Sequence, residues 1–173
     1  LILRNSNIID AEITFGSGFN TEKASSPRRI DFAALRPAGD GAEIAFYEAK
    51  LFSNKALRAA GETLPQITGQ MEEYRKLLIQ NADDVQRAYR TVCGNLAALH
   101  GVRDRYTASL DLLRRLASGE APLRVDEDVW LVVFGFDSGQ RNGAVWKPHL
   151  DKLLSWKPGR VILAGDAGQI RVD

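Results

Sequence analysis

This chain has little of what disulfide, zinc or membrane proteins require. Its single cysteine, Cys93, excludes an internal disulfide, and its two histidines, His100 and His149, are too far apart for zinc-ligand spacing. No apolar run approaches the roughly 18 residues of a membrane-spanning helix, and the longest covers residues 129–136. Cys93 falls on an apolar helical stripe, which indicates a buried thiol in a reducing compartment. We therefore expect a cytoplasmic protein with no membrane partner.

The length of 173 residues fits one domain, residues 1–173, with a core of its own. The first residue is Leu1 rather than methionine, so we expect a fragment of a longer chain whose upstream helix is missing. Residues 1–23 read as one extended segment with alternating apolar and polar positions. Glu12 on that segment is either an exposed strand residue or an additional metal-binding carboxylate. Further domains of the longer chain, or a second copy, are the expected protein partners.

Two apolar runs, residues 28–35 and 43–50, are separated by a short turn around Gly39 and Asp40. If they form a hairpin that closes at this turn, residues whose numbers add up to about 79 face each other. Asp31 then lies opposite Glu48, with Cβ atoms roughly 5 Å apart, where two like charges are destabilising. A bound divalent cation would explain two carboxylates in register within apolar strands.

Lys50 completes this group, because side chains alternate along a strand and Lys50 projects from the same face as Glu48. Two carboxylates suit Mg²⁺, which completes its octahedron with water and phosphate oxygens. A neighbouring ammonium can orient the attacking water and offset charge on the phosphate. The pattern predicts a site for metal-assisted phosphodiester hydrolysis. The alternative is a surface hairpin with scattered charges.

The next segment, residues 66–78, has helical spacing. Gln70 and Tyr74 are four residues apart and therefore share one helical face. The adjacent apolar stripe consists of Ile67, Met71, Tyr74 and Leu78.

In this order of motifs the sequence resembles the PD-(D/E)xK nuclease superfamily, whose fold is called restriction-endonuclease-like. The family places an Asp on one strand, a Glu-x-Lys on the next and, in many branches, a Gln-x-x-x-Tyr on the following helix. The matching residues, within a segment shorter than half the chain, are Asp31, Glu48, Lys50, Gln70 and Tyr74. Ile30 precedes the Asp where the family name implies proline.

The resemblance implies a Mg²⁺-dependent deoxyribonuclease in which Mn²⁺ can substitute. It implies that the metal ligands are Asp31, Glu48 and the main-chain carbonyl of Ala49. Lys50 would position or activate water, and Gln70 and Tyr74 would support the site and orient substrate. Defence, restriction and repair are the biological settings that the resemblance suggests.

Basic residues lie close in sequence to this site, although the net charge of +1 does not itself indicate a nucleic-acid-binding protein. Phosphate contacts would have to be made near the site. The candidates for DNA-backbone contacts are Arg28, Arg29, Lys55 and Arg58.

The pattern of the whole sequence predicts an α/β domain with a central mixed sheet and helices on both faces. Residues 82–118 contain a pair of helices, inserted in or packed on the core. Residues 129–136 predict a strand covered on both faces. A helix over 145–156 and strands over 160–164 and 169–172 complete the domain.

We conclude from the sequence that a DNA-cleaving, metal-dependent nuclease is the leading function. Two alternatives remain: a non-catalytic nucleic-acid- or protein-binding module on the same fold, and a phosphohydrolase of small nucleotides. The choice between DNA and RNA, and between internal and terminal cutting, also remains open.

Overall fold

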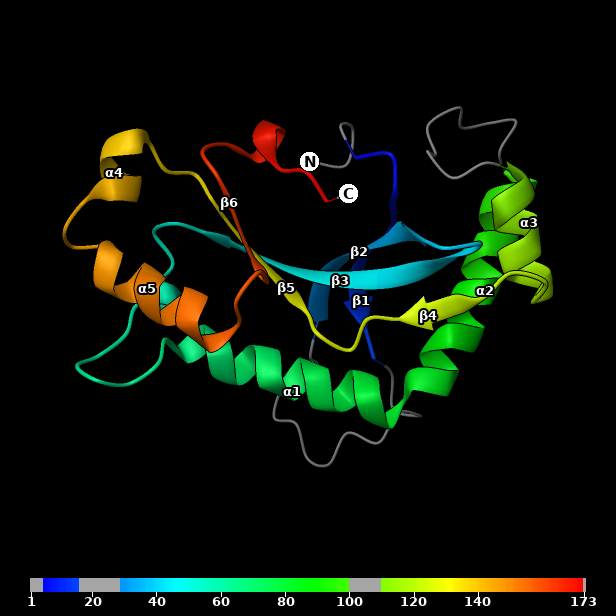
Figure 1. The fold of residues 1–173 in the computed structure, drawn as a ribbon, viewed down its shortest axis with the longest axis horizontal. Coiled ribbons are helices and arrows are strands. Elements are labelled where there is room, and N and C mark those ends of the chain that lie inside the picture. The colour runs from blue at the N-terminus through cyan, green and yellow to red at the C-terminus, as the bar shows by residue number, and fades with distance from the viewer. Residues whose placement is uncertain (1–4, 16–28, 100–109, 173) are drawn as a thin grey trace.

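The computed structural model describes residues 5–15, 29–99 and 110–172 and shows an α/β protein with a six-stranded mixed sheet and five α-helices in these residues (Figure 1). The strands are β1 (Ile8–Thr14), β2 (Arg29–Ala38), β3 (Gly41–Leu51), β4 (Leu123–Val125), β5 (Trp130–Phe134) and β6 (Val161–Ala164). The α-helices are α1 (Gln66–Gln80), α2 (Ala82–Ala98), α3 (Leu110–Ser118), α4 (Ser138–Asn142) and α5 (Lys147–Trp156). Two 3₁₀ turns, η2 (Lys55–Leu57) and η3 (Ala167–Gln169), complete the elements.

The strands follow the order β1-β2-β3-β5-β6, and β4 pairs with the first part of β3. The first three strands are antiparallel, whereas β3, β4, β5 and β6 run parallel. Strand β3 is therefore central, since it bonds β2 along one edge and β4 followed by β5 along the other. This mixed sheet confirms the predicted α/β class.

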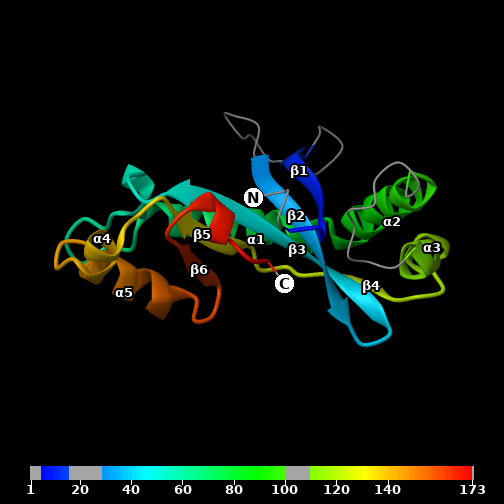
Figure 2. The same ribbon diagram turned by 90° about the horizontal axis from the view of Figure 1, so that it is seen from above.

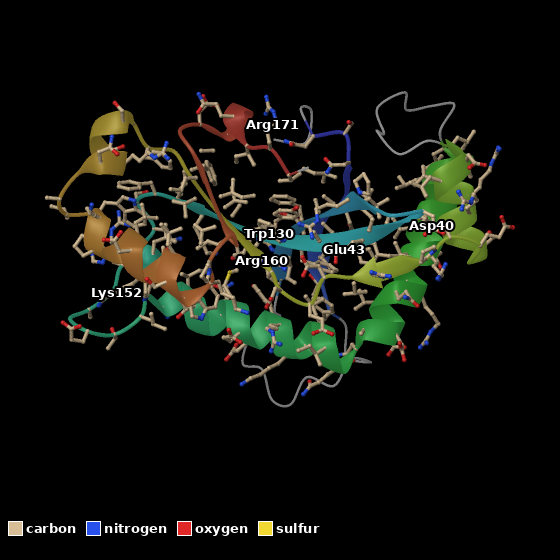
Figure 3. All side chains as sticks on the ribbon, in the orientation of Figure 1. Asp40, Glu43, Trp130, Lys152, Arg160 and Arg171 are labelled. Atoms are coloured by element: carbon tan, nitrogen blue, oxygen red, sulfur yellow. The ribbon has the colours of Figure 1, made fainter. Side chains whose placement is uncertain are left out.

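The β2–β3 hairpin has the predicted register. Phe32 pairs with Tyr47, Ala38 pairs with Gly41, and every pair between them also adds up to 79. The turn contains Gly39, whose φ of +61° favours glycine, and exposed Asp40 lies at the tip (Figure 3). Gly41 is needed for a different reason, because a Cβ there would lie 2.0 Å from the Pro122 carbonyl oxygen.

The apolar residues form two clusters, one on each side of the sheet. Apart from Leu77, the buried apolar residues of α1, α2, α3 and α5 belong to the larger cluster. The smaller cluster contains residues of the strands and of the chain after β6, but none from an α-helix. Of the predicted helices on both faces, α1, α2, α3 and α5 pack on one face, and no α-helical residue of the described chain belongs to the cluster on the other.

The predicted helical pair within residues 82–118 corresponds to α2 and α3, which lie side by side at one end of the sheet (Figures 1 and 2). Both helices place leucines in the larger cluster, so the pair is packed on the core. Cys93 is fully buried there, and burial raises the pKa of its thiol to about 11. His100 lies outside the described residues.

The C-terminal part differs from the prediction in detail. Strand β5 is buried on both faces as expected, and α5 and β6 lie close to their predicted positions. Residues 169–172 are not a strand, which corrects that prediction. Instead, the Asn5 side chain bonds Ile170 O at 3.0 Å, and the Asn7 side chain bonds Val172 O at 2.7 Å. Two side-chain amides thus hold the tail where strand pairing was expected.

Helix α5 also anchors the segment before α1. His149 Nδ1 accepts a hydrogen bond from the Ala59 N–H at 3.0 Å, which requires the neutral imidazole. Burial lowers the pKa of His149, and the positive charges of Arg58 and Lys152 lower it further. The folded state therefore favours neutral His149.

We expect this contact to make stability depend on pH below about 6.5, the ordinary histidine value. Because the folded pKa is lower than the unfolded one, the stabilisation is complete above that pH and is lost as pH falls through the folded pKa. The hydrogen bond should contribute about 1 kcal/mol. In thermal melts from pH 8 to 5, the melting temperature of His149→Gln should fall less on acidification than that of the parent. Identical pH profiles for the parent and His149→Gln would contradict this expectation.

No helix in residues 5–15, 29–99 or 110–172 is both long and apolar enough to cross a membrane.

Candidate active site

The β2–β3 hairpin places Asp31 and Glu48 on the same face of the sheet. The Phe32 and Tyr47 rings stack at 4.8 Å on the other face, and this is the last pair of the β2–β3 ladder. Asp31 and Glu48 adjoin that pair, so by alternation both project toward the helices. Asp31 Oδ2 accepts a hydrogen bond from the Ala49 N–H at 2.7 Å, which ties this carboxylate to β3. The structure thus brings together the two carboxylates that the sequence predicted to be opposed.

The two oxygens of the Glu48 carboxylate have different surroundings. Oε1 forms an ion pair with Lys50 Nζ and accepts a hydrogen bond from Gln70 Nε2 at 3.1 Å. Oε2 is buried and has no hydrogen-bond partner among the described residues. Glu48 is only 2% exposed, so an unpaired carboxylate oxygen here is costly.

Burial is the main reason that the pKa of Glu48 is raised, and the nearby negative charge of Asp31 raises it further. Hydrogen bonds from Lys50 and Gln70 and the positive charge of Lys50 act in the opposite direction. Glu48 is therefore a carboxylate whose negative charge is incompletely compensated by its neighbours. A cation at Oε2 would supply the missing compensation.

Helix α1 supplies Gln70 and Tyr74 because its apolar stripe packs against this face. Ile67, Met71 and Leu78 are at most 2% exposed, so the predicted burial of the stripe is confirmed. Gln70 Nε2 contacts the Tyr74 hydroxyl oxygen at 2.6 Å, and that hydroxyl donates to the Arg29 carbonyl oxygen at 2.6 Å. Burial raises the pKa of Tyr74 to about 12, and the charges of Glu48 and Asp31 raise it as well.

The donor set fits a small divalent cation. Asp31 and Glu48 Oε2 supply carboxylate oxygens, and the N–H and C=O of one strand residue point toward the same neighbouring strand. Since the Ala49 N–H points toward Asp31, the Ala49 carbonyl is directed to that side too. Within the described residues no three Asp, Glu, His or Cys side chains form a metal-binding group. Such a cation would therefore rely on water and substrate oxygens, as Mg²⁺ commonly does.

Glu12 is not part of this donor set. Its side chain is 75% exposed and lies 3.6 Å from the Arg29 guanidinium. Its backbone φ of +56° lies in the left-handed region, which is uncommon for residues other than glycine. Of the two roles considered for Glu12, the structure supports the exposed strand residue.

The four basic candidates differ in their surroundings. Arg28 lies outside the described residues, Arg29 is half-exposed beside Glu12, and Lys55 is exposed on η2. Arg58 is stacked against the rings of Phe52 and Trp146, with its guanidinium carbon 4.7 and 4.5 Å from their centroids. It also donates to the Phe52 carbonyl at 2.8 Å, and burial lowers its pKa. These contacts give Arg58 a structural role.

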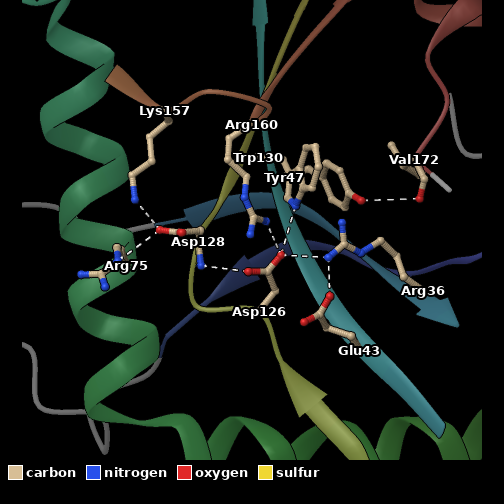
Figure 4. Close-up of polar contacts among 10 residues, drawn as sticks. All are labelled: Arg36, Glu43, Tyr47, Arg75, Asp126, Asp128, Trp130, Lys157, Arg160 and Val172. Atoms are coloured by element: carbon tan, nitrogen blue, oxygen red, sulfur yellow. Dashed lines mark hydrogen bonds and ion pairs between the residues drawn. The ribbon is translucent and has the colours of Figure 1, made fainter. Parts of the chain in front are cut away.

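A second polar cluster, the Asp126 cluster, lies on the opposite face of the sheet and was not predicted (Figure 4). Asp126 accepts hydrogen bonds from Trp130 Nε1 at 3.1 Å and Arg36 at 3.0 Å, and it also pairs with Arg160. Arg36 and Arg160 both stack on the Trp130 ring, 5.0 and 4.7 Å from its centroid. Arg36 additionally pairs with Glu43. The only sequence signal was a set of charged residues flanking apolar strands.

The Asp126 cluster has a structural explanation. The Asp126 N–H donates to Ile44 O at 2.9 Å, at the point where β3 changes its partner from β4 to β5. Each positive group in the cluster has a carboxylate partner. The Asp126 carboxylate has four donors, because it also accepts a hydrogen bond from the Asp128 N–H at 3.2 Å. The Asp126 cluster therefore holds the β4–β5 connection onto the sheet.

Comparisons with protein families, with curated proteins and with solved structures gave no match.

Proposed function

We propose that this protein is a metal-dependent nuclease that hydrolyses DNA phosphodiester bonds on a restriction-endonuclease-like fold. One observation carries the proposal: Glu48 is buried near the charge of Asp31, with Oε1 held by Lys50 and Gln70 and Oε2 without a hydrogen-bond partner among the described residues. This arrangement is unfavourable without a cation. The mixed sheet and the position of α1 against the Asp31–Glu48 face also support the proposal.

In this proposal Asp31, Glu48 Oε2 and the Ala49 carbonyl would hold the metal, which when bound would supply polarisation of the phosphate and a more acidic bound water. Lys50, as an ammonium, has only protons to donate. It therefore orients the attacking water by donating to its oxygen, and it offsets negative charge on the phosphate. The water oxygen forms the new bond to phosphorus, the bond from phosphorus to one sugar oxygen breaks, the water proton goes to solvent, and the leaving sugar oxygen takes up a proton from solvent. Gln70 and Tyr74 hold Glu48 in place.

The alternative function, a non-catalytic binding module, does not explain the two neighbouring carboxylates or the unpartnered oxygen of Glu48. Such a module gains nothing from two opposed carboxylates, which weaken a hairpin, and has no need for an unpartnered buried oxygen. Functional sites commonly retain such unfavourable groups because chemistry requires them.

The direct test is incubation of the purified protein with linear and with circular DNA in Mg²⁺ or Mn²⁺, with parallel samples in EDTA. We expect cleavage in either metal and none in the chelator. Cutting of the circle would show internal cleavage, and an RNA substrate of the same sequence tests the choice of nucleic acid. Absence of metal-dependent cleavage of every substrate would refute the proposal.

Asp31→Asn separates stability from activity. Asparagine Oδ1 can still accept the Ala49 N–H, while loss of one negative charge relieves repulsion with Glu48. We expect a metal-free melting temperature equal to or slightly above that of the parent, no cleavage, and weaker metal binding. At a metal concentration ten times Kd the parent should gain about 1.4 kcal/mol, and Asp31→Asn should gain less.

Asp40→Asn, at the exposed hairpin tip, is the matched control for Asp31→Asn and should cut and bind metal like the parent. Parental cleavage by Asp31→Asn, or its failure to fold, would count against the proposed site.

A further inference from the structure

The two edge strands of the described sheet, β1 and β6, differ in how well they are protected against pairing with another strand (Figure 2). The ladder of β1 has a register shift between Ile8 and Asp10, and the strand carries the acidic residues Asp10 and Glu12. Bulges and charged side chains are the features by which natural proteins prevent edge strands from pairing. Strand β6 has neither feature, because its four residues are all apolar and its ladder to β5 is regular.

The outer edge of β6 presents main-chain groups to which no other strand of the described residues is paired. Leu131 of β5 donates its N–H to the Arg160 carbonyl at 2.9 Å, so the main-chain groups of Arg160, and by alternation those of Ile162, point toward β5. The N–H and C=O groups of Val161 and Leu163 therefore point outward. A further strand can pair with these donors and acceptors.

Both faces of this edge are apolar and incompletely covered. Val161 and Leu163 pack against the larger cluster, whereas Ile162 packs against the smaller one. All three side chains are only partly buried. A strand paired to β6 would extend both clusters, because cross-strand apolar pairs stabilise a sheet on each of its faces.

The sequence of β6 fits a second copy of the same strand in antiparallel orientation. In the register that uses every outward group, Val161 faces Leu163 of the second copy, and Ile162 faces its own counterpart. Each of the two Val161–Leu163 pairs then exchanges two hydrogen bonds across a twofold axis. Arg160 precedes β6 and the exposed Asp166 follows it, so antiparallel pairing puts these opposite charges at diagonal positions. Parallel pairing would instead place like charges side by side.

We propose that β6 is an interface between two copies of this chain, which join their sheets edge to edge into one continuous sheet. The twofold axis is perpendicular to this sheet, so both copies present their helix-covered faces to the same side. Five strand spacings separate the two β3 strands, so the two Glu48 sites lie roughly 24 Å apart. One turn of duplex DNA is about 34–36 Å long, so both sites fit within one turn. Only this last consequence rests on the proposed function.

The test is sedimentation velocity of the metal-free protein without DNA, over a series of concentrations. We expect the parent to form a dimer as the concentration rises. Val161→Pro removes an N–H that the monomer does not use, at the first residue of an edge strand, where proline is tolerated. The variant loses one hydrogen bond from each Val161–Leu163 pair, so the dimer dissociation constant should increase by about 10- to 100-fold.

Two further variants keep the test independent of folding defects. Val161→Ala shortens the same side chain but retains the N–H, so it is the matched control and should lose much less affinity than Val161→Pro. Ile162→Lys places two ammonium groups opposite each other in the dimer, whereas in the monomer the lysine lies at a sheet edge, where lysine is common. Ile162→Lys should be monomeric, with a thermal melt that shows a folded protein.

A parent that stays monomeric at every concentration would overturn the interface. So would a dimer that both Val161→Pro and Ile162→Lys retain with parental affinity. The nuclease proposal fails separately, because a dimer that cuts no nucleic acid keeps the interface, whereas a monomer that cuts DNA rejects it. If both proposals hold, the parent should convert circular DNA directly to the linear form, while Val161→Pro should accumulate nicked circles first.

Discussion

Lys50→Ala is expected to reduce metal-dependent DNA cleavage by at least about 100-fold, the lower end of what removal of one charge-stabilising hydrogen-bond donor costs. The variant loses the ammonium that would orient the attacking water and offset charge on the phosphate. The fold should survive, because Gln70 still holds Glu48 Oε1 and a carboxyl with a raised pKa can take up a proton. Mn²⁺ binding should also persist, since Lys50 supplies no metal ligand.

The measurement is single-turnover cleavage of labelled DNA at saturating Mg²⁺, with a thermal melt on the same preparation. Lys147→Ala changes an exposed lysine at the start of α5 and serves as the matched control, with parental rates expected. A Lys50→Ala protein that is folded, binds metal and cuts at the parental rate would remove Lys50 from the mechanism.

Asp126→Ala is expected to cause the largest loss of stability among single changes considered for this chain. Truncation would leave Arg36, Arg160 and Trp130 Nε1 without their shared acceptor beneath the β4–β5 connection. Breaking a buried ion pair costs about 3–5 kcal/mol. Because both guanidinium groups are partly exposed and Arg36 keeps Glu43, we expect about 2–4 kcal/mol.

Urea unfolding at pH 7 measures this loss. Asp84→Ala removes an exposed ion pair with Arg87 and should cost about 0–1 kcal/mol, which makes it the control. A similar cost for both variants would show that the Asp126 cluster does not hold the β4–β5 connection. If the smaller cluster around Tyr47 also loosens, Tyr47 and Trp130 fluorescence should change before global unfolding.

The sequence alone determined the hairpin and the helix face that form the site. The period of two along a strand and the Gly39–Asp40 turn establish which residues oppose each other, and both are local properties. Likewise, a separation of four residues places Gln70 and Tyr74 on one face of any α-helix. The location of the site could therefore be predicted, although its chemistry stays a proposal.

Only the tertiary structure determined which groups the site residues contact and how the rest of the domain packs. The different surroundings of the two Glu48 oxygens depend on α1 docking against β3, and the Asp126 cluster joins residues from three separate strands and loops. The packing of α1, α2, α3 and α5 on one face also depends on distant segments. So does the replacement of a last strand by asparagine contacts from residues 5 and 7. Local periodicity contains no information about such pairs, because the free energy of each contact depends on which distant group the folded chain brings to it.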